Sequence, residues 1–162
     1  QLRQQSINVE LQTAGSAAKG KDEETLAQQA HQAVRPGTKV AVIFGHPGEL
    51  GGAAAAVMSA ITEVKKTAPE VKLLVIGPAW TIGQPPKSVR AMNGALRAEA
   101  RATGATFVEP LADGWFVGQP ELVGPDHVTL TDAGHAYLAN KMAPLIAQQL
   151  QSLPVSPAAT PR

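Results

Sequence analysis

Three short runs of aliphatic residues, each followed by a helical stretch, most strongly constrain how this chain can fold. They are residues 39–44 (KVAVIF), 71–76 (VKLLVI) and 106–108 (TFV). Nearly continuous apolar runs are typical of strands buried on both faces of a parallel sheet. Apolar residues then recur at helical spacing in 53–66, 88–103 and 131–147. This alternation predicts an α/β fold, a three-layer sandwich with helices on both faces of a parallel sheet.

The segment before the first run predicts one more strand and one more helix. Residues 7–13 alternate apolar and polar side chains, which favours an edge strand with one polar face. A helix follows, with Asp22 as its expected N-cap, and Pro36-Gly37 ends it. Because His31 falls on the polar side of this helix, we expect it at the surface.

Composition bounds the size of the protein and its partners. The 162 residues amount to about one domain, which we place at 1–150, followed by a Pro-rich tail at 151–162 that predicts disorder. A net charge of +1 and 4% aromatic residues argue against nucleic acid as a partner. No apolar run reaches the ~20 residues of a membrane span. Cysteine is absent and the histidines and acids show no metal-ligand spacing, so we expect no metal and no other cofactor.

Glycines and single functional side chains gather where the predicted strands end. Gly15 follows the first strand, Gly45, His46 and Gly48 follow the second, and Trp80 lies in the loop after the third. Folds of this class bind ligands beyond the carboxyl ends of their strands. We therefore expect these residues at one edge of the sheet, with Trp80 either bounding a ligand or packed beneath its own loop.

The loop and helix at 124–142 carry the strongest local signal for a site. Asp126 and His127 are adjacent in the loop, and Thr131 is placed to cap the helix that follows. Titratable groups in a loop that enters a helix are common in α/β enzymes. A capped helix with a polar lead-in is the purely structural alternative.

The order of these elements resembles the SGNH/GDSL hydrolase family, which contains serine esterases and acyltransferases, over about residues 1–150. The segments most similar to actinobacterial members are IGPAW (76–80), NGALRAEARATGATFVEPL (93–111) and DHVTLTDAGHAYLA (126–139). The resemblance implies a Gly-Asp-Ser nucleophile block, a glycine, a Gly-x-Asn-Asp turn and an Asp-x-x-His pair. It also implies a sheet of order 2-1-3-4-5, in which the nucleophile strand lies between the strands at 7–13 and 39–44.

The four blocks of that family match unevenly. Gly15 fits the glycine block and Gly45 opens the third block, but Gly48 stands where the family has asparagine. The resemblance thus implies the loss of one oxyanion donor, worth roughly 3 kcal/mol in related sites. Asp126 matches the family's acid, whereas Thr129 occupies its histidine position and cannot serve as a base.

The base and the nucleophile are therefore left open. His127 lies two residues from Thr129 and shares its side of an extended loop, and His46 is another histidine near the expected site. The chain contains no Gly-Asp-Ser, and the resemblance places that block before the first residue. We expect residues 1–162 alone to lack esterase activity, because no base is positioned by sequence for Ser6, Ser16, Ser59 or Ser88.

Two functions remain open. One is an ester hydrolase or acyltransferase for a neutral acylated small molecule or carbohydrate, completed by a complementary N-terminal segment that fills the slot beside 39–44. An empty slot would leave rows of backbone groups unpaired. The alternative is that the strand at 7–13 pairs directly with 39–44 in a four-stranded sheet, and we favour the added segment because 7–13 alternates like an edge strand with one polar face. The other function is a catalytically inactive binding or scaffold domain, favoured by Gly48 and Thr129. The Pro-Ala tail favours a secreted or cell-envelope protein, with the cytoplasm as the alternative.

Overall fold

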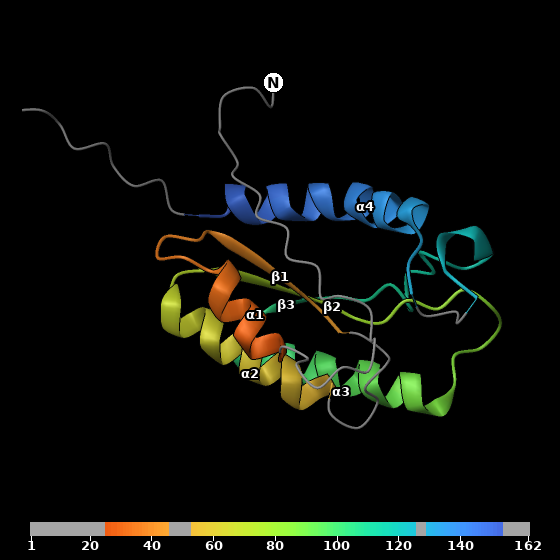
Figure 1. The fold of residues 1–162 in the computed structure, drawn as a ribbon, viewed down its shortest axis with the longest axis horizontal. Helices are drawn as coiled ribbons and strands as arrows, with labels where there is room; N and C mark the ends of the chain where they lie inside the picture. Colours follow the sequence, from red (N-terminus) through yellow and green to blue (C-terminus); the bar gives the residue numbers. More distant parts are fainter. Residues whose placement is uncertain (1–24, 46–52, 126–128, 154–162) are drawn as a thin grey trace, which may run out of the picture.

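Three parallel strands form the centre of the molecule. The computed structural model describes residues 25–45, 53–125 and 129–153. The strands β1 (Val40–Phe44), β2 (Lys72–Ile76) and β3 (Thr106–Val108) pair in parallel in the order β1-β2-β3 (Figure 1). The predicted α/β class is confirmed, and so are these three strands to within one residue. The strand predicted over 7–13 lies outside the described residues, as does any pairing between it and β1.

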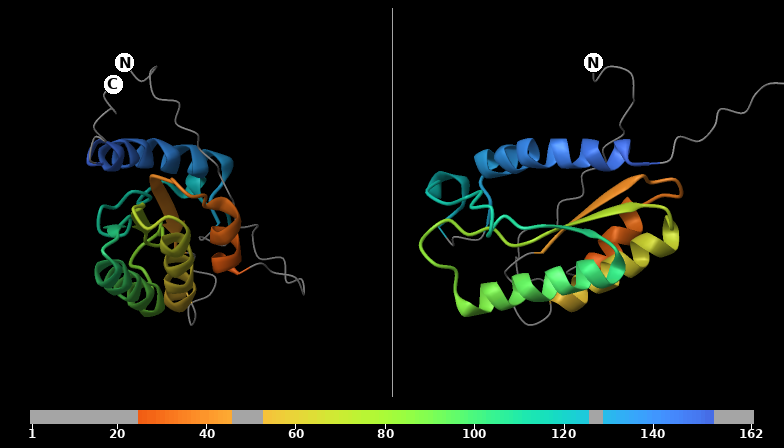
Figure 2. Two further views of the ribbon diagram at one scale, coloured as in Figure 1. Left: turned by 90° about the vertical axis from the view of Figure 1, so that its left-hand side faces the viewer. Right: turned by 180° about the vertical axis from the view of Figure 1, so that it is seen from behind.

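The helices lie in two layers, one on each face of the sheet. The helices α1 (Leu26–Ala33), α2 (Ala53–Thr67) and α3 (Lys87–Thr103) cover one face, and α4 (Asp132–Gln151) covers the other (Figures 1 and 2). A short 3-10 helix, η2 (Pro120–Leu122), precedes α4. The arrangement is the predicted three-layer sandwich.

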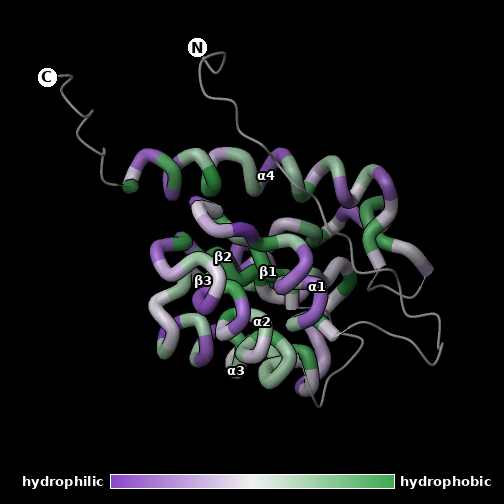
Figure 3. Tube along the Cα trace, turned by 60° about the vertical axis from the view of Figure 1, so that its left-hand side comes forward, coloured by the Kyte–Doolittle hydropathy of each residue, from purple (hydrophilic) through white to green (hydrophobic). Residues whose placement is uncertain are grey.

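Each face of the sheet has its own apolar core. Ile43, Leu73 and Val75 pack beneath α1, α2 and α3, while Leu74 and Ile76 pack beneath α4. The alternation along β2 sends successive side chains to opposite faces, as strand geometry requires. All of these side chains are apolar. In Figure 3 the strands accordingly contain much of the green that marks hydrophobic residues, and they lie between the two helix layers. The predicted stripes of the helices face these cores: Val57, Ala60, Ile61 and Val64 on α2, Val89, Met92, Leu96 and Ala100 on α3, and Leu138 and Met142 on α4.

The helix boundaries confirm one predicted cap and correct two other predictions. Thr131 caps α4 by accepting from the Gly134 amide, as predicted, and Gly104 ends α3 in the left-handed region at φ 70°. The N-cap of α1 is Thr25 and not Asp22. Thr25 forms a capping box in which its hydroxyl accepts from the Gln28 amide and the Gln28 side chain accepts from the Thr25 amide. Two backbone donors are satisfied at once, so the helix begins there.

The second correction concerns the end of α4, which continues past the predicted limit at 147 to Gln151 and contains Pro144 within its length. Leu145 and Ile146 still pack against the sheet, and these contacts hold the helix beyond the proline. Residues 154–162 of the predicted tail lie outside the described residues. Among the described helices, none combines the length and apolar character needed to cross a membrane.

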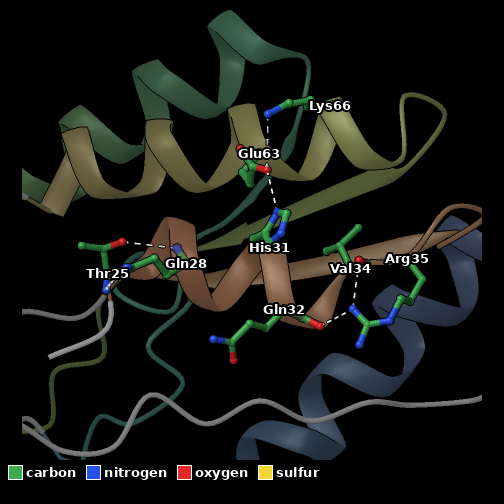
Figure 4. A network of polar contacts seen from close by, with 8 residues as sticks. All are labelled: Thr25, Gln28, His31, Gln32, Val34, Arg35, Glu63 and Lys66. Atoms are coloured by element: carbon green, nitrogen blue, oxygen red, sulfur yellow. Dashed lines mark hydrogen bonds and ion pairs between the residues drawn. The ribbon is translucent and has the colours of Figure 1, made fainter. Parts of the chain in front are cut away.

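A polar contact links α1 to α2 at the surface. His31 Nδ1 lies 2.9 Å from Glu63 Oε1, and Lys66 Nζ lies 3.9 Å from the same oxygen (Figure 4). The His31 side chain is 71% exposed, which confirms its predicted surface position. An exposed pair of this kind contributes on the order of 0–1 kcal/mol to folding, so the apolar contacts between the helices hold them together.

Candidate functional site

The carboxyl ends of all three strands meet at one edge of the sheet, named here the carboxyl edge. Phe44, Ile76 and Val108 are in register and end their strands at the same level. The ladder continues for one more residue, because the Gly45 amide donates to Ile76 O and the Gly77 amide donates to Val108 O, each at 2.9 Å. The loops that leave this edge are the places where folds of this class position ligands.

Gly45 allows α3 to approach the end of β1. A Cβ at this position would lie 2.2 Å from Leu96 Cδ1 and 3.3 Å from Ile76 O, so the buried glycine is explained by packing. Sequence analysis placed Gly45 in a substrate or oxyanion site. It lies at the carboxyl edge, but its amide is already bonded to Ile76 and is not directed to a ligand.

A polar tie fastens the exits of β2 and β3 to α3. Asn93 of α3 is 6% exposed, and its Nδ2 donates to Glu109 Oε1 at 2.6 Å. Arg97 forms an ion pair with the same carboxylate oxygen. A Cβ at Gly77 would lie 2.6 Å from Asn93 Oδ1, so this glycine also permits a close helix approach. The Glu109 carboxylate is therefore occupied by structural contacts with Asn93 and Arg97.

The loops after β2 and β3 are joined above the carboxyl edge. The Gly118 amide donates to Thr81 O at 3.3 Å, and the two loops run side by side at the right of Figure 1. Trp80 is half-buried, and its Nε1 donates to Ile82 O at 2.7 Å. The indole is therefore held by its own loop while part of it stays exposed, and both predicted alternatives for Trp80 stay predictions.

The segment before α4 returns on itself in a narrow loop. Val123 and Leu130 form an antiparallel bridge, and the Gly124 amide donates to Thr129 O at 2.7 Å. Thr131 then ties α4 to η2, because its amide donates to Leu122 O and its hydroxyl donates to Glu121 O. The described ends of the loop that carries the Asp126-His127 pair are thus fixed.

Three of the predicted site residues are described, and they lie at the same end of the molecule. Gly45 follows β1, Trp80 follows β2, and Thr129 lies in the loop that enters α4 (Figure 1). The other five predicted site residues lie outside the described residues: Gly15, His46, Gly48, Asp126 and His127. Their roles, and the prediction that Asp126 accepts hydrogen bonds at the mouth of the sheet, stay predictions.

Sequence reasoning missed three residues at the carboxyl edge. Thr81 is 3% exposed, and within the described part of the chain its hydroxyl has no hydrogen-bond partner. Ile82 and Val117 are large apolar side chains that are 54% and 63% exposed. The sequence signal that could have identified Ile82 and Val117 is an aliphatic residue next to a glycine in a predicted loop. Phe116, which precedes Val117, is 1% exposed and packs edge-on against Tyr137 in the core under α4.

The described residues supply few groups for acid–base chemistry at this edge. His135 Nδ1 lies 3.0 Å from Thr131 O, a distance that fits a protonated Nδ1 donating and leaves Nε2 as the basic nitrogen. Ser59 and Ser88 lie on α2 and α3, as predicted. No group of three histidines, cysteines or acids within the described ranges is arranged to hold a metal ion.

Two hollows in the described part of the protein lie away from the carboxyl edge. One, of about 310 Å³, opens at the opposite ends of β2 and β3 and is lined by Lys65, Glu70 and Gln149 among others. The other, of about 350 Å³, lies beside His31 and Glu63. Both are open and neither contains a predicted site residue, so the candidate site stays at the carboxyl edge.

Comparison with known proteins finds a sequence relative that is named a GDSL lipase. No protein-family model matches this chain. Over 144 residues it is 38% identical to the GDSL lipase Rv0518 of Mycobacterium tuberculosis, an alignment that covers 85% of the chain and 62% of the relative. The chain thus spans less than two thirds of the length of that protein.

Two solved structures have the same fold. One is described as a peptidoglycan O-acetylesterase, with a TM-score of 0.53 and 15% identity over 79% of the chain and 40% of that structure. The other is a protein from Lactobacillus plantarum, with a TM-score of 0.53 and 17% identity over 73% and 71% of the two chains. At these identities the likeness concerns the fold alone.

Proposed function

The chain belongs to the SGNH/GDSL hydrolase family, and from this premise we propose that it contributes to an ester-hydrolysing site whose serine is carried by a further segment of polypeptide. The sequence relative is named a lipase, which supports ester chemistry. The chain has no Gly-Asp-Ser block, and Ser59 and Ser88 lie on helices.

The observation that carries this proposal is that the described residues leave one edge of β1 unpaired and one of its faces poorly covered. Within the described residues no strand pairs with its second edge. Its side chains toward α4 are also poorly covered, because Val40 and Val42 are only half-buried and Phe44 is 43% exposed. An apolar edge strand without charges or proline is an open template for a partner strand. The complementary N-terminal segment would pair there and end beside Gly45.

The chemistry of the completed site follows from the family pattern. A serine on the added strand attacks the ester carbonyl, a histidine accepts the serine proton, and backbone amides stabilise the oxyanion. Asp126 orients the histidine in the family pattern. Because Thr129 replaces the family's histidine, the base is His127 or His46, and because Gly48 replaces asparagine, the oxyanion receives fewer donors.

Active-site labelling tests the proposal directly. A fluorophosphonate reacts with an activated serine, so we expect it to label the longest natural polypeptide that contains this sequence, at a serine outside residues 1–162. The same polypeptide should hydrolyse p-nitrophenyl acetate, and residues 1–162 alone should not. Peptide mass mapping of a label on Ser6, Ser16, Ser59 or Ser88 would overturn the proposed origin of the nucleophile.

The second candidate function is a non-catalytic member that keeps the fold as a binding or scaffold module. Gly48 and Thr129 favour it, because each replaces a side chain that the catalytic pattern uses. This alternative predicts neither labelling nor turnover in the longest natural polypeptide, together with retained binding of an acylated ligand. The variant Thr129→His returns the family's histidine to its position in that polypeptide. Ester turnover should increase in this variant only if the polypeptide also contains the nucleophilic serine.

The proposed ligand is a neutral ester, either a small molecule or an acylated carbohydrate, and acyl transfer to a second alcohol is included. The loop at 77–86 contains no charged residue, which supports a neutral ligand over a phosphorylated one.

We also propose a secreted or cell-envelope location. Fractionation of cells that express the natural gene, with immunodetection in medium, envelope and cytoplasm, tests this, and a purely cytoplasmic signal would contradict it.

A further inference from the structure

The two most exposed large apolar side chains of the described residues flank a single hydrogen bond at the carboxyl edge. The bond runs from the Gly118 amide to Thr81 O. Ile82 follows Thr81 and is 54% exposed, and Val117 precedes Gly118 and is 63% exposed. Two loops that are far apart in sequence thus meet at this bond, and each carries an exposed aliphatic residue next to it.

The surroundings of this pair are neutral and held in place. The indole of Trp80 is bonded to Ile82 O at 2.7 Å, which holds an aromatic ring in the same loop as the first aliphatic residue. The left-handed glycines Gly83 (φ 62°) and Gly118 (φ 74°) fix the turns on either side. The loop at 77–86 has no charged residue, and Asp113 is the one charge in 110–119. A charged ligand would find no ionic partner beside Ile82 in its own loop.

We propose that Ile82 and Val117, with the exposed part of Trp80, form an acyl-binding surface that selects aliphatic chains longer than acetyl. This inference rests on the proposed ester-binding function and names the acyl part of its ligand. An uncharged apolar surface at the end where the family binds its esters matches an uncharged alkyl chain.

A protein partner fits this surface less well. Stable protein interfaces bury about 800 Å² on each partner, which is far more than two exposed aliphatic side chains provide. A single alkyl chain needs only a few apolar contacts in a row. The Thr81 hydroxyl is buried, 3% of the residue being exposed, and has no partner within the described ranges, so the contacts offered to the alkyl chain come from the exposed side chains of Ile82 and Val117.

Tryptophan fluorescence measures this binding without any need for catalysis. The chain has two tryptophans, so Trp115→Phe leaves Trp80 as the reporter. Titration with the methyl ester of 12-bromododecanoic acid, which is uncharged, should quench Trp80, whereas the methyl ester of bromoacetic acid should not. Ile82→Asn and Val117→Asn should each weaken binding about tenfold, the change expected when one aliphatic contact is lost. Val117→Ile should keep the wild-type affinity, and Ala91→Ser on the exposed side of α3 serves as the matched control.

The results separate this inference from the proposed function. Unchanged affinity in both asparagine variants, or equal binding of the short and the twelve-carbon methyl esters, overturns the acyl-binding surface. A drop in the molecular mass of the protein in light scattering caused by Ile82→Asn also overturns it, since the surface would then be a contact between two copies. Failure of the fluorophosphonate to label the longest natural polypeptide removes catalysis but leaves binding of the twelve-carbon ester intact.

Discussion

The two faces of the sheet differ most at β1. On the face covered by α1, α2 and α3, Ile43 is 6% exposed and belongs to a continuous core. On the face covered by α4, Val40 and Val42 remain half-buried and Phe44 is 43% exposed. Ala41 on the first face is half-buried as well, so the two faces differ at the C-terminal end of the strand, where Ile43 is covered and Phe44 is not. At that end the second face has room for a further segment.

The largest expected effect compares a core residue on each face. Leu96 is fully buried on α3 and touches the end of β1, so Leu96→Ala should lower the free energy of unfolding by about 3 kcal/mol. Val42→Ala, on the half-covered face, should cost less than about 1 kcal/mol. Urea denaturation followed by circular dichroism measures both. Equal losses would show that the two faces are packed equally well.

The next effect concerns how α4 is fastened to its face. A Cβ at Gly134 would lie 1.9 Å from Leu122 O, so Gly134→Ala must displace α4 from η2. We expect a loss of about 2 kcal/mol, as for other overpacked sites. Gly94→Ala is the matched control, because it is also helical and its Cβ would meet nothing within 4 Å. That variant should be neutral or slightly more stable. A loss of equal size at both positions would contradict the close approach.

A smaller effect should follow from removing the N-cap of α4. Thr131 Oγ1 accepts from the Gly134 amide at 3.1 Å and donates to Glu121 O at 2.9 Å. Thr131→Ala removes both bonds and should cost about 1 kcal/mol in thermal or chemical unfolding. Thr131→Ser keeps the hydroxyl and should recover most of the loss. If serine behaves like alanine, the hydroxyl is not what fixes the helix.

The local pattern of the sequence was sufficient for the elements but not for the close approaches between them. The strands at 39–44, 71–76 and 106–108 were found because their apolar character is continuous, and Thr131 was found because caps are chemically specific. Thr25 was missed in favour of Asp22, because both can cap and only the reciprocal bond with Gln28 decides between them.

The candidate site was predictable only where chemistry is visible in single residues. Topology placed Trp80 at the carboxyl edge and the family pattern placed Thr129 in the site; both lie at that end of the sheet, and their roles stay predictions. The reason for Gly45 was not predictable, since its contact with Leu96 joins residues that are distant in sequence. The exposure of Ile82 and Val117 was missed for the same reason, because it depends on how two loops meet.

The smallest expected effect sharpens the comparison of the two faces most. Phe44→Tyr adds a hydroxyl to a ring that is 43% exposed, so in residues 1–162 the free energy of unfolding should change by only about 0.3 kcal/mol. In the longest natural polypeptide, the proposed segment would cover that ring and bury the hydroxyl without a partner, which costs about 1 kcal/mol or more. Ile82→Asn, at the carboxyl edge, should have the same small effect in both proteins. If Phe44→Tyr is equally mild in both, nothing covers this face of β1, and the segment that carries the serine does not pair there.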